Sequence, residues 1–316
     1  MKVQTVLPRD AIRSIDTPEF ASEYFGDAGD ELIVVEGDPP RAYPIRTLSY
    51  HEIVNDTIDD TPVAVTWCPI CWSAVAYERT VDGRPLTFGT SGKLADDALV
   101  MYDRETGSEW RQPSGECLAG EFEGHTLTAV PTATTTWRRF TGSYPGGVVL
   151  QPVRGGAGPG QRSPAREYDM EPYRQYYRDD DFGLYAMRGE GARRTWDRDD
   201  LDAKALVLGI EHEDEAVGYP LERVETAGGF VTDTVGGQEV VVVAAEGELH
   251  AFVNPGFEFE RNRDALIADG TRWNPRTGHS DDSRRLDRVA ARTLFAFAWQ
   301  DDHGPDAFYD PMEDDR

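Results

Sequence analysis

The chain of 316 residues contains an internal repeat, and this repeat limits the folds that it can adopt. Five segments recur in the same order: residues 33–36 in 207–211, 42–45 in 218–221, 55–65 in 232–242, 76–77 in 251–252, and 103–107 in 274–278. Two of them contain short Val- and Ile-rich runs, and Asp82-Gly83 is a strong hairpin signal. We therefore expect a mainly β fold of the α+β class, built from two degenerate tandem repeats of a β-rich unit with a few short helices and packed as a pseudo-symmetric pair.

The repeat also sets the expected domain boundaries. Residues 1–30 form an N-terminal extension, 31–153 the first repeat, 154–203 a connector, and 204–316 the degenerate second repeat. The connector starts with a Gly-rich stretch, 155–160, which is typical of a flexible linker. Beyond it, we expect Tyr168, Tyr173, Tyr176 and Tyr177 to pack across the domains. Short helices are expected at 48–54, which would include His51 and Glu52, and at 134–140.

The charge of the chain restricts its partners. There are 58 acidic and 32 basic residues, which gives a net charge of −26, and only three of the bases are lysines. Such a surface repels phosphate backbones, so we expect no nucleic-acid partner. It is typical of a halophilic, salt-adapted protein, whose surface must stay hydrated where screening is strong. No apolar run is long enough to span a membrane and no leader peptide is evident, so a cytoplasmic location is predicted.

The segment Thr66–Trp72 holds two of the three cysteines of the chain, Cys68 and Cys71. The second repeat has Ala244–Glu248 at this position, and it has no counterpart of His51 either. Because two cysteines and a histidine are absent together from the second repeat, we infer that they form one functional unit in the first.

The chain resembles one known family through a set of short motifs. They are Tyr43-Pro44, His51-Glu52-Ile53-Val54-Asn55-Asp56-Thr57, Cys68-Pro69-Ile70-Cys71, Leu86-Thr87-Phe88-Gly89, Ser91-Gly92, Met101-Tyr102-Asp103-Arg104 and Thr106-Gly107-Ser108. This is the family named only as domain of unknown function 3179, and the resemblance covers most of the chain. It implies a degenerate second half and names no activity. Cys117 departs from the family pattern, which argues against a role as a ligand.

The first hypothesis for the cysteines is a metal site. Cys68, Cys71 and His51 make a three-ligand set that suits zinc with an open position or a soft copper site. Glu52 or Glu78 would then hold the histidine or act on bound water.

Two alternatives remain open. The pair resembles the Trp-Cys-x-x-Cys of dithiol oxidoreductases, with Cys68 as nucleophile and Cys71 as resolving thiol. However, the strand predicted after Cys71 replaces the helix of that fold. The third hypothesis is a binding module with inert buried thiols, in which Trp67, Trp72 and Trp110 anchor a small molecule or protein partner.

Overall fold

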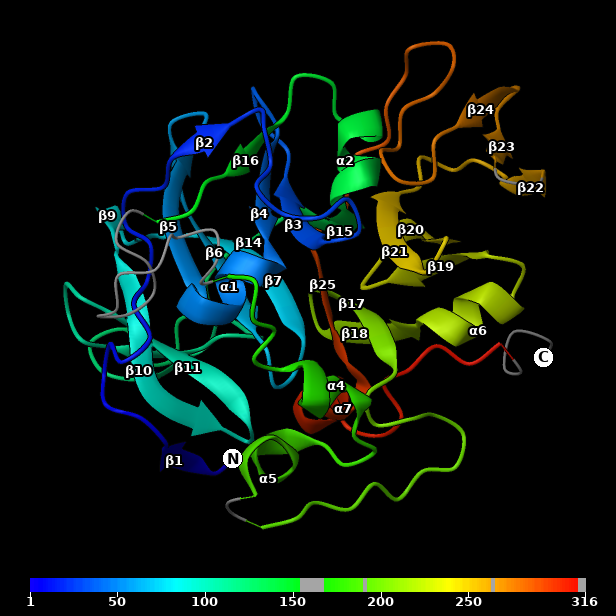
Figure 1. Ribbon diagram of the computed structural model, residues 1–316. Coiled ribbons are helices and arrows are strands. Elements are labelled where there is room, and N and C mark those ends of the chain that lie inside the picture. Colours follow the sequence, from blue (N-terminus) through cyan, green and yellow to red (C-terminus); the bar gives the residue numbers. More distant parts are fainter. Residues whose placement is uncertain (154–167, 190–191, 263–264, 312–316) are drawn as a thin grey trace. The chain divides into compact units, whose positions relative to one another are not determined.

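The computed structural model describes residues 1–153, 168–189, 192–262 and 265–311 (Figure 1). Two units are present, Met1–Asp197 and Arg198–Arg316. Strands predominate in both units, which confirms the predicted fold class. The glycine-rich stretch 155–160, predicted to be a flexible linker, lies outside the described residues.

The strands of unit 1 are short and mostly antiparallel. In chain order, its elements are β1 (Val3–Thr5), β2 (Phe20–Ala21), β3 (Glu31–Val35), β4 (Arg41–Pro44), α1 (Ile45–His51), β5 (Ile53–Ile58), β6 (Thr61–Cys68), β7 (Ser73–Glu78), β8 (Thr80–Val81), β9 (Arg84–Pro85), β10 (Phe88–Ala95), β11 (Ala98–Asp103), β12 (Glu109–Arg111), β13 (Cys117–Ala119), β14 (Ala129–Val130), β15 (Thr132–Thr136), α2 (Trp137–Ser143), β16 (Val148–Leu150), α4 (Arg174–Arg178) and α5 (Gly183–Arg188).

Three sheets contain all of these strands except β8 and β9, which pair with each other. One has the order β1-β10-β11-β12-β13, a second has the order β15-β3-β4-β16-β2, and the third contains β5-β6-β7 with β14 paired to β7. Apolar side chains from β3, β4 and α2 pack together, with Leu32, Val34 and Phe140 at most 1% exposed. The third sheet carries the cysteines, because β6 ends at Cys68 and β7 starts two residues after Cys71.

Helix α1 ends earlier than predicted, and this changes the position of Glu52. The helix starts directly after Pro44, whose φ of −63° suits a helix start, and its last residue is His51. Glu52 caps the helix in the left-handed conformation, with φ 59°, and its N–H donates to the carbonyl of Leu48 at 2.7 Å. A left-handed residue ends the helix and turns its side chain away from the helix face.

The second predicted helix starts later than the sequence suggested. Residues 132–136 form β15, which pairs with β3 so that Thr134 lies opposite Ile33, and α2 starts at Trp137. Runs of threonine favour strands, and the neighbouring β3 provides the hydrogen bonds.

The described part of the connector packs on the strands of unit 1. The hydroxyl of Tyr176 donates to the carbonyl of Ile70 at 2.6 Å, and the backbone N–H of Gly183 donates to that same hydroxyl at 3.2 Å. Arg194 pairs with Asp97 at 3.3 Å. These contacts hold α4 and α5 near the ends of β10 and β11, as Figure 1 shows.

Unit 2 has its own elements and its own core. They are β17 (Leu206–His212), β18 (Glu215–Pro220), α6 (Leu221–Thr226), β19 (Phe230–Val235), β20 (Gln238–Ala245), β21 (Glu248–Val253), β22 (Glu260–Asn262), β23 (Ala265–Ala268), β24 (Thr271–Trp273), β25 (Ala291–Phe295) and α7 (Ala296–His303). The core gathers side chains from β17 to β21 and α6, among them Ile210, Val224 and Val242 at 0% exposure.

The two units contain a stretch with the same order of elements. In unit 1 it runs strand, strand, helix and three strands from β3 to β7, and in unit 2 it runs likewise from β17 to β21. In each stretch, a tyrosine hydroxyl donates to an aspartate in the next strand: Tyr43 to Asp56 at 2.6 Å and Tyr219 to Asp233 at 2.7 Å. The internal repeat stays a prediction. A shared order of elements does not show that the two stretches arose from one repeated unit.

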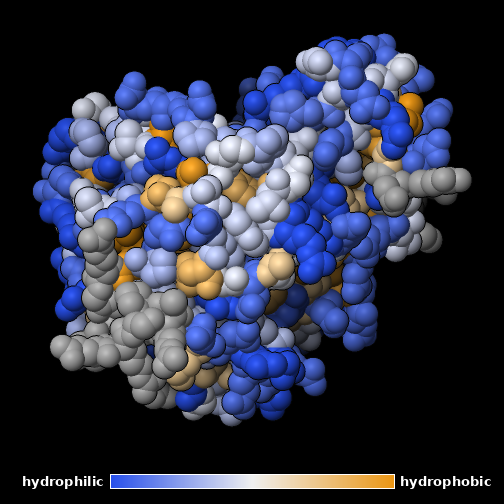
Figure 2. Space-filling view, turned by 45° about the horizontal axis from the view of Figure 1, so that its top comes forward, coloured by the Kyte–Doolittle hydropathy of each residue, from blue (hydrophilic) through white to orange (hydrophobic). Residues whose placement is uncertain are grey.

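The surface agrees with the acidic composition. The face in Figure 2 is mostly hydrophilic, and hydrophobic residues show as small separate areas. Among the described residues, the large apolar side chains that are exposed are Met1, Val3 and Met170. No helix in the described part of the chain combines the length and the apolar composition needed to cross a bilayer.

Candidate functional site

The two cysteines lie in the turn of the β6–β7 hairpin. Cys68 is opposite Ser73 in the antiparallel register, so residues 69–72 form the turn. Trp72 has φ 54°, an uncommon value for a residue with a side chain, and it closes the turn tightly. Both thiols are free and buried, at 1% and 0% exposure, and the Sγ of Cys71 is 3.9 Å from the carbonyl oxygen of Cys68. The structure thus brings together the pair that the sequence singled out.

The surroundings of Cys68 favour its thiolate. Burial acts to raise the pKa of a thiol, because it penalises the charged form. Hydrogen bonds from the thiol and the backbone N–H of Cys71 oppose this effect, as do those from the N–H groups of Leu99 and Ile70. The N–H of Leu99 is 3.4 Å from the sulfur. As a result, the pKa of Cys68 lies below its ordinary value of 9.0.

Cys71 has the opposite character. Burial and the adjacent Cys68 raise its pKa well above the ordinary value of 9.0, so Cys71 keeps its proton. Thiol–disulfide exchange uses such a pair, a thiol with a lowered pKa next to a thiol that keeps its proton.

Glu52 is a buried carboxyl near the cysteines. Its backbone carbonyl accepts a hydrogen bond from Trp67 N–H at 2.8 Å, which holds the end of α1 against β6. Its side chain is 6% exposed. Burial, followed by the charge of Cys68, raises the pKa of Glu52 from 4.5 to about 8, against the lowering effect of Arg188.

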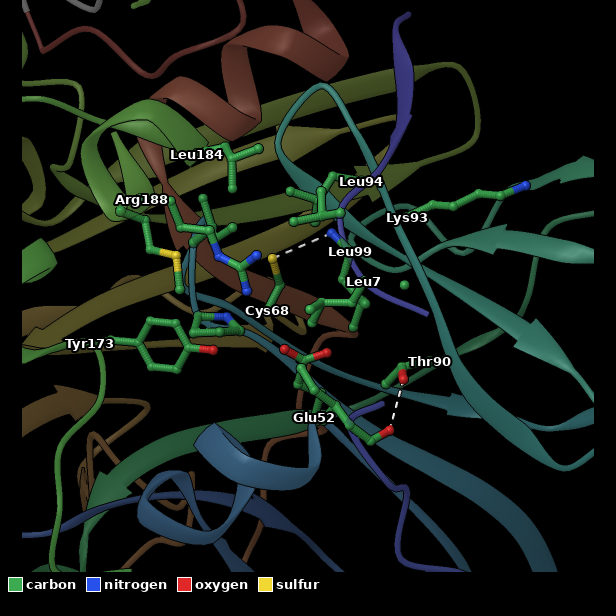
Figure 3. A pocket seen from close by; sticks show the side chains of 16 residues that line it. Leu7, Glu52, Cys68, Thr90, Lys93, Leu94, Leu99, Tyr173, Leu184 and Arg188 are labelled. Carbon is green, nitrogen blue, oxygen red and sulfur yellow. Dashed lines mark hydrogen bonds between the residues drawn. The ribbon is translucent and has the colours of Figure 1, made fainter. Parts of the chain in front are cut away.

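A cavity of about 50 Å³ lies beside the sulfur of Cys68 (Figure 3). Its walls are mostly apolar, and they come from the N-terminal segment, the cysteine turn, strands β10 and β11, and the connector with helix α5. Figure 3 shows the carboxyl of Glu52, the hydroxyl of Tyr173 and the guanidinium of Arg188 directed toward this space. Cys68 therefore faces a cavity, whereas Cys71 does not line it.

The structure does not bring His51 to the thiols. The ring is 2% exposed, and both of its nitrogens have other partners: the carbonyl of Arg13 at 2.7 Å and the hydroxyl of Tyr168 at 2.6 Å. Glu52 was predicted to hold His51 or to act on bound water. Its side chain does not hold His51 and points into the cavity instead. Within the described ranges, no group of three or more His, Cys, Asp or Glu side chains is placed to hold a metal ion.

The other predicted side chains belong to the core of unit 1. Trp67 and Trp110 are 0% exposed and Trp72 is 8% exposed, so none of the three stands open as an anchor for a partner. Cys117 lies in β13, where burial raises its pKa to about 11. The connector tyrosines pack on unit 1, for example Tyr168 on His51.

Two cavity residues, Tyr173 and Arg188, were not predicted from the sequence. Both lie more than 100 residues after Cys68 in the chain, on a connector whose high content of Tyr and Arg was the one available signal. The pattern around Cys68 carries no information about which distant segment covers it.

Comparisons with known proteins give one match. The model of a family described as "Protein of unknown function (DUF3179)" matches residues 9–307. No curated protein and no solved structure matches the chain.

Proposed function

The chain belongs to the DUF3179 family, whose description names no activity, and on the site alone we propose that it is a thiol–disulfide oxidoreductase. Cys68 is the nucleophile and Cys71 is the resolving thiol. The observation that carries the proposal is the contrast between two adjacent thiols. The pKa of Cys68 is lowered and its sulfur faces a cavity, whereas the pKa of Cys71 is raised and Cys71 is buried and does not line the cavity.

The chemistry balances with the groups present and a substrate disulfide. The Cys68 thiolate attacks one sulfur of the disulfide, the substrate S–S bond breaks, and the second sulfur leaves with the electron pair. Glu52, protonated near neutral pH, gives its proton to this leaving thiolate. Cys71 then attacks Cys68, its proton passes to Glu52, and the first substrate sulfur leaves and takes that proton. The substrate gains two electrons and two protons, and the protein gains a Cys68–Cys71 disulfide.

A thiol of the surroundings must reduce the protein disulfide again. The predicted cytoplasmic location would supply such thiols, because that compartment keeps cysteines reduced. The missing helix after Cys71 does not prevent the chemistry, since backbone N–H groups and the Cys71 thiol take over the role of a helix N-terminus in lowering the pKa of Cys68.

A redox titration tests the proposal. The protein is equilibrated with mixtures of reduced and oxidised dithiothreitol, quenched in acid, unfolded and labelled with a maleimide, and the labels are counted by mass spectrometry. We expect two labels to be lost together in one two-electron transition. Cys68→Ser and Cys71→Ser should abolish this transition, and Cys117→Ser, the matched control, should keep it.

A small uncharged disulfide provides the second half of this test. With bis(2-hydroxyethyl) disulfide, Cys71→Ser should accumulate a mixed disulfide at Cys68, since the resolving thiol is absent. If the wild-type protein keeps three labels at every dithiothreitol ratio, the thiols are inert and the proposal is wrong.

Binding of a soft metal ion is the second candidate, because two thiols in one turn can hold Cu(I) or zinc without the histidine. The observation in its favour is the proximity of the two buried sulfurs. Metal analysis of protein purified anaerobically, beside Cys68→Ala/Cys71→Ala, separates the candidates. Stoichiometric copper or zinc that the double variant lacks would establish metal binding.

A further inference from the structure

Three polar side chains that line the cavity interact with one another only through their charges. In the described part of the chain, no hydrogen bond or ion pair is made by the carboxyl of Glu52, the hydroxyl of Tyr173 or the guanidinium of Arg188. Glu52 and Tyr173 are 6% and 8% exposed. Arg188 is exposed, so solvent can hydrate its guanidinium, but Glu52 and Tyr173 are buried. Buried polar groups are nearly always hydrogen bonded, so these two groups at a cavity indicate a ligand that supplies the missing partners.

Arg188 differs from the other cation of the cavity wall. The Nζ of Lys93 pairs with both carboxylate oxygens of Glu109, at 2.6 and 2.9 Å, and Figure 3 shows the lysine directed away from Cys68. The guanidinium of Arg188, in contrast, is directed toward the sulfur of Cys68. A guanidinium presents a planar fork of N–H donors that matches a carboxylate.

The position of Arg188 is fixed through helix α5. It is the last residue of this helix, which Gly189 ends in the left-handed conformation at φ 69°. At the start of the helix, Gly183 donates to the Tyr176 hydroxyl, which in turn donates to Ile70 in the cysteine turn. The segment from Tyr176 to Arg188 therefore contacts the turn that holds Cys68 and also carries the guanidinium. The fold thus fixes the position of Arg188 relative to Cys68.

The remaining walls limit the size of the ligand. They are mostly apolar, with Leu7, Leu94 and Leu184 among them, and the cavity is only about 50 Å³. A volume of this size holds a few heavy atoms, so only a small part of a ligand lies inside it.

From these observations we infer that the substrate is a small carboxylic acid that carries a thiol or disulfide sulfur, with its carboxylate bound by Arg188 and its sulfur placed at Cys68. The sulfur part of this inference rests on the proposed function, whereas the carboxylate part stands on the cavity alone. Tyr173 and the protonated Glu52 donate to the remaining oxygens and to the leaving sulfur.

Alkylation of Cys68 measures carboxylate recognition without any disulfide chemistry. Iodoacetate and iodoacetamide react alike: the thiolate attacks the methylene carbon, a C–S bond forms, the C–I bond breaks and iodide leaves. They differ in that only iodoacetate carries a carboxylate. The rates at Cys68 are followed by peptide mass mapping in about 1 M KCl, where the Debye length is about 3 Å and the net charge of −26 is screened.

In the wild type, we expect the iodoacetate reaction to saturate with concentration and to be faster than the iodoacetamide reaction. Arg188→Gln should lower the ratio of the two rates about tenfold, the effect of losing one charge-assisted pair. Arg188→Lys should give an intermediate ratio, and Lys93→Gln, the matched control, should leave it unchanged. A variant that changes the pKa of Cys68 or the access to it changes both rates by the same factor. The ratio of the two rates is therefore unaffected by such changes.

Unreactive acids give an independent readout. Propionate should protect Cys68 from iodoacetamide in the wild type but not in Arg188→Gln, and propionamide should protect neither. The inference is overturned if Arg188→Gln leaves the ratio unchanged, or if neither reagent reaches Cys68 in the folded protein. A carboxylate preference without any dithiol transition would refute the proposed function alone, and a dithiol transition without the preference would refute this inference alone.

Discussion

At the scale of single residues, Glu52 links the stability of the fold to pH. Burial and the charge of Cys68 raise its pKa from 4.5 to about 8. The folded protein therefore holds this proton more tightly than the unfolded chain. The resulting stabilisation is fully present below about pH 4.5 and is lost as the pH rises through about 8.

Replacement of Glu52 by glutamine removes this titration. Between pH 5 and pH 8, the free energy of unfolding of the wild type should fall relative to Glu52→Gln by up to about 1.4 kcal/mol per pH unit. Urea unfolding of both proteins at several pH values measures the difference. Parallel pH curves would mean that the carboxyl ionises in the folded protein as it does in water.

Cys71 should control the reactivity of Cys68. In Cys71→Ala the thiol that donates to Cys68 is absent, so the pKa of Cys68 should rise. The pH midpoint of iodoacetamide alkylation at Cys68 should shift upward by about one unit or more, and Cys117→Ala should leave it unchanged. An unchanged midpoint in Cys71→Ala would show that the backbone N–H groups alone stabilise the thiolate.

The sequence predicted part of the site and missed another part for physical reasons. Cys68 and Cys71 share one turn, so local sequence defines their proximity. His51 is close in sequence, but its nitrogens are taken by Arg13 and Tyr168, the second of which is 117 residues away. Arg188 reaches the cavity only through the packing of the connector, which no local pattern encodes.

At the scale of elements, the connector covers the cavity through one hydroxyl. Tyr176 donates to Ile70 and accepts from Gly183, and it is 3% exposed. Tyr176→Phe leaves both backbone groups without this partner, which should cost about 1 to 3 kcal/mol of unfolding free energy. It should also speed the alkylation of Cys68 by iodoacetamide, because α5 is held less firmly.

Tyr185→Phe is the matched control for this variant. Tyr185 lies on α5 as well, but its hydroxyl makes no hydrogen bond within the described ranges. Thermal unfolding and alkylation rates of this variant should match the wild type. Equal behaviour of Tyr176→Phe and Tyr185→Phe would show that the connector is held by its apolar contacts.

Strands were predicted better than helices. β6, β7 and β11 have alternating or continuous apolar runs bounded by turn residues, so their own sequence defines them. The helices in the described part of the chain are only five to eight residues long, too short for a helical period to show. Their ends depend on neighbours, as at Glu52 and at the strand that precedes Trp137.

At the scale of the whole molecule, each unit has a tyrosine–aspartate pair that ties its strands together. Asp56 also accepts from Arg41 and is 7% exposed, whereas Asp233 is half-buried. Tyr43→Phe should therefore destabilise unit 1 by about 1.5 to 3 kcal/mol, and Tyr219→Phe should destabilise unit 2 by about 1 kcal/mol.

Hydrogen exchange read by mass spectrometry assigns each loss to a unit. Faster exchange should appear in residues 1–153 for Tyr43→Phe and in residues 206–262 for Tyr219→Phe. Loss of protection throughout the chain in either variant would show that the two units unfold as one cooperative body.

The two tryptophans of the cysteine turn give the site an optical property. Trp67 precedes Cys68, Trp72 follows Cys71, and their rings meet edge to face with centroids 4.9 Å apart. Both thiolates and disulfides quench the excited state of a nearby indole, and they do so to different extents. The intrinsic emission of the protein should therefore report the oxidation state of Cys68 and Cys71 in real time, without any added dye.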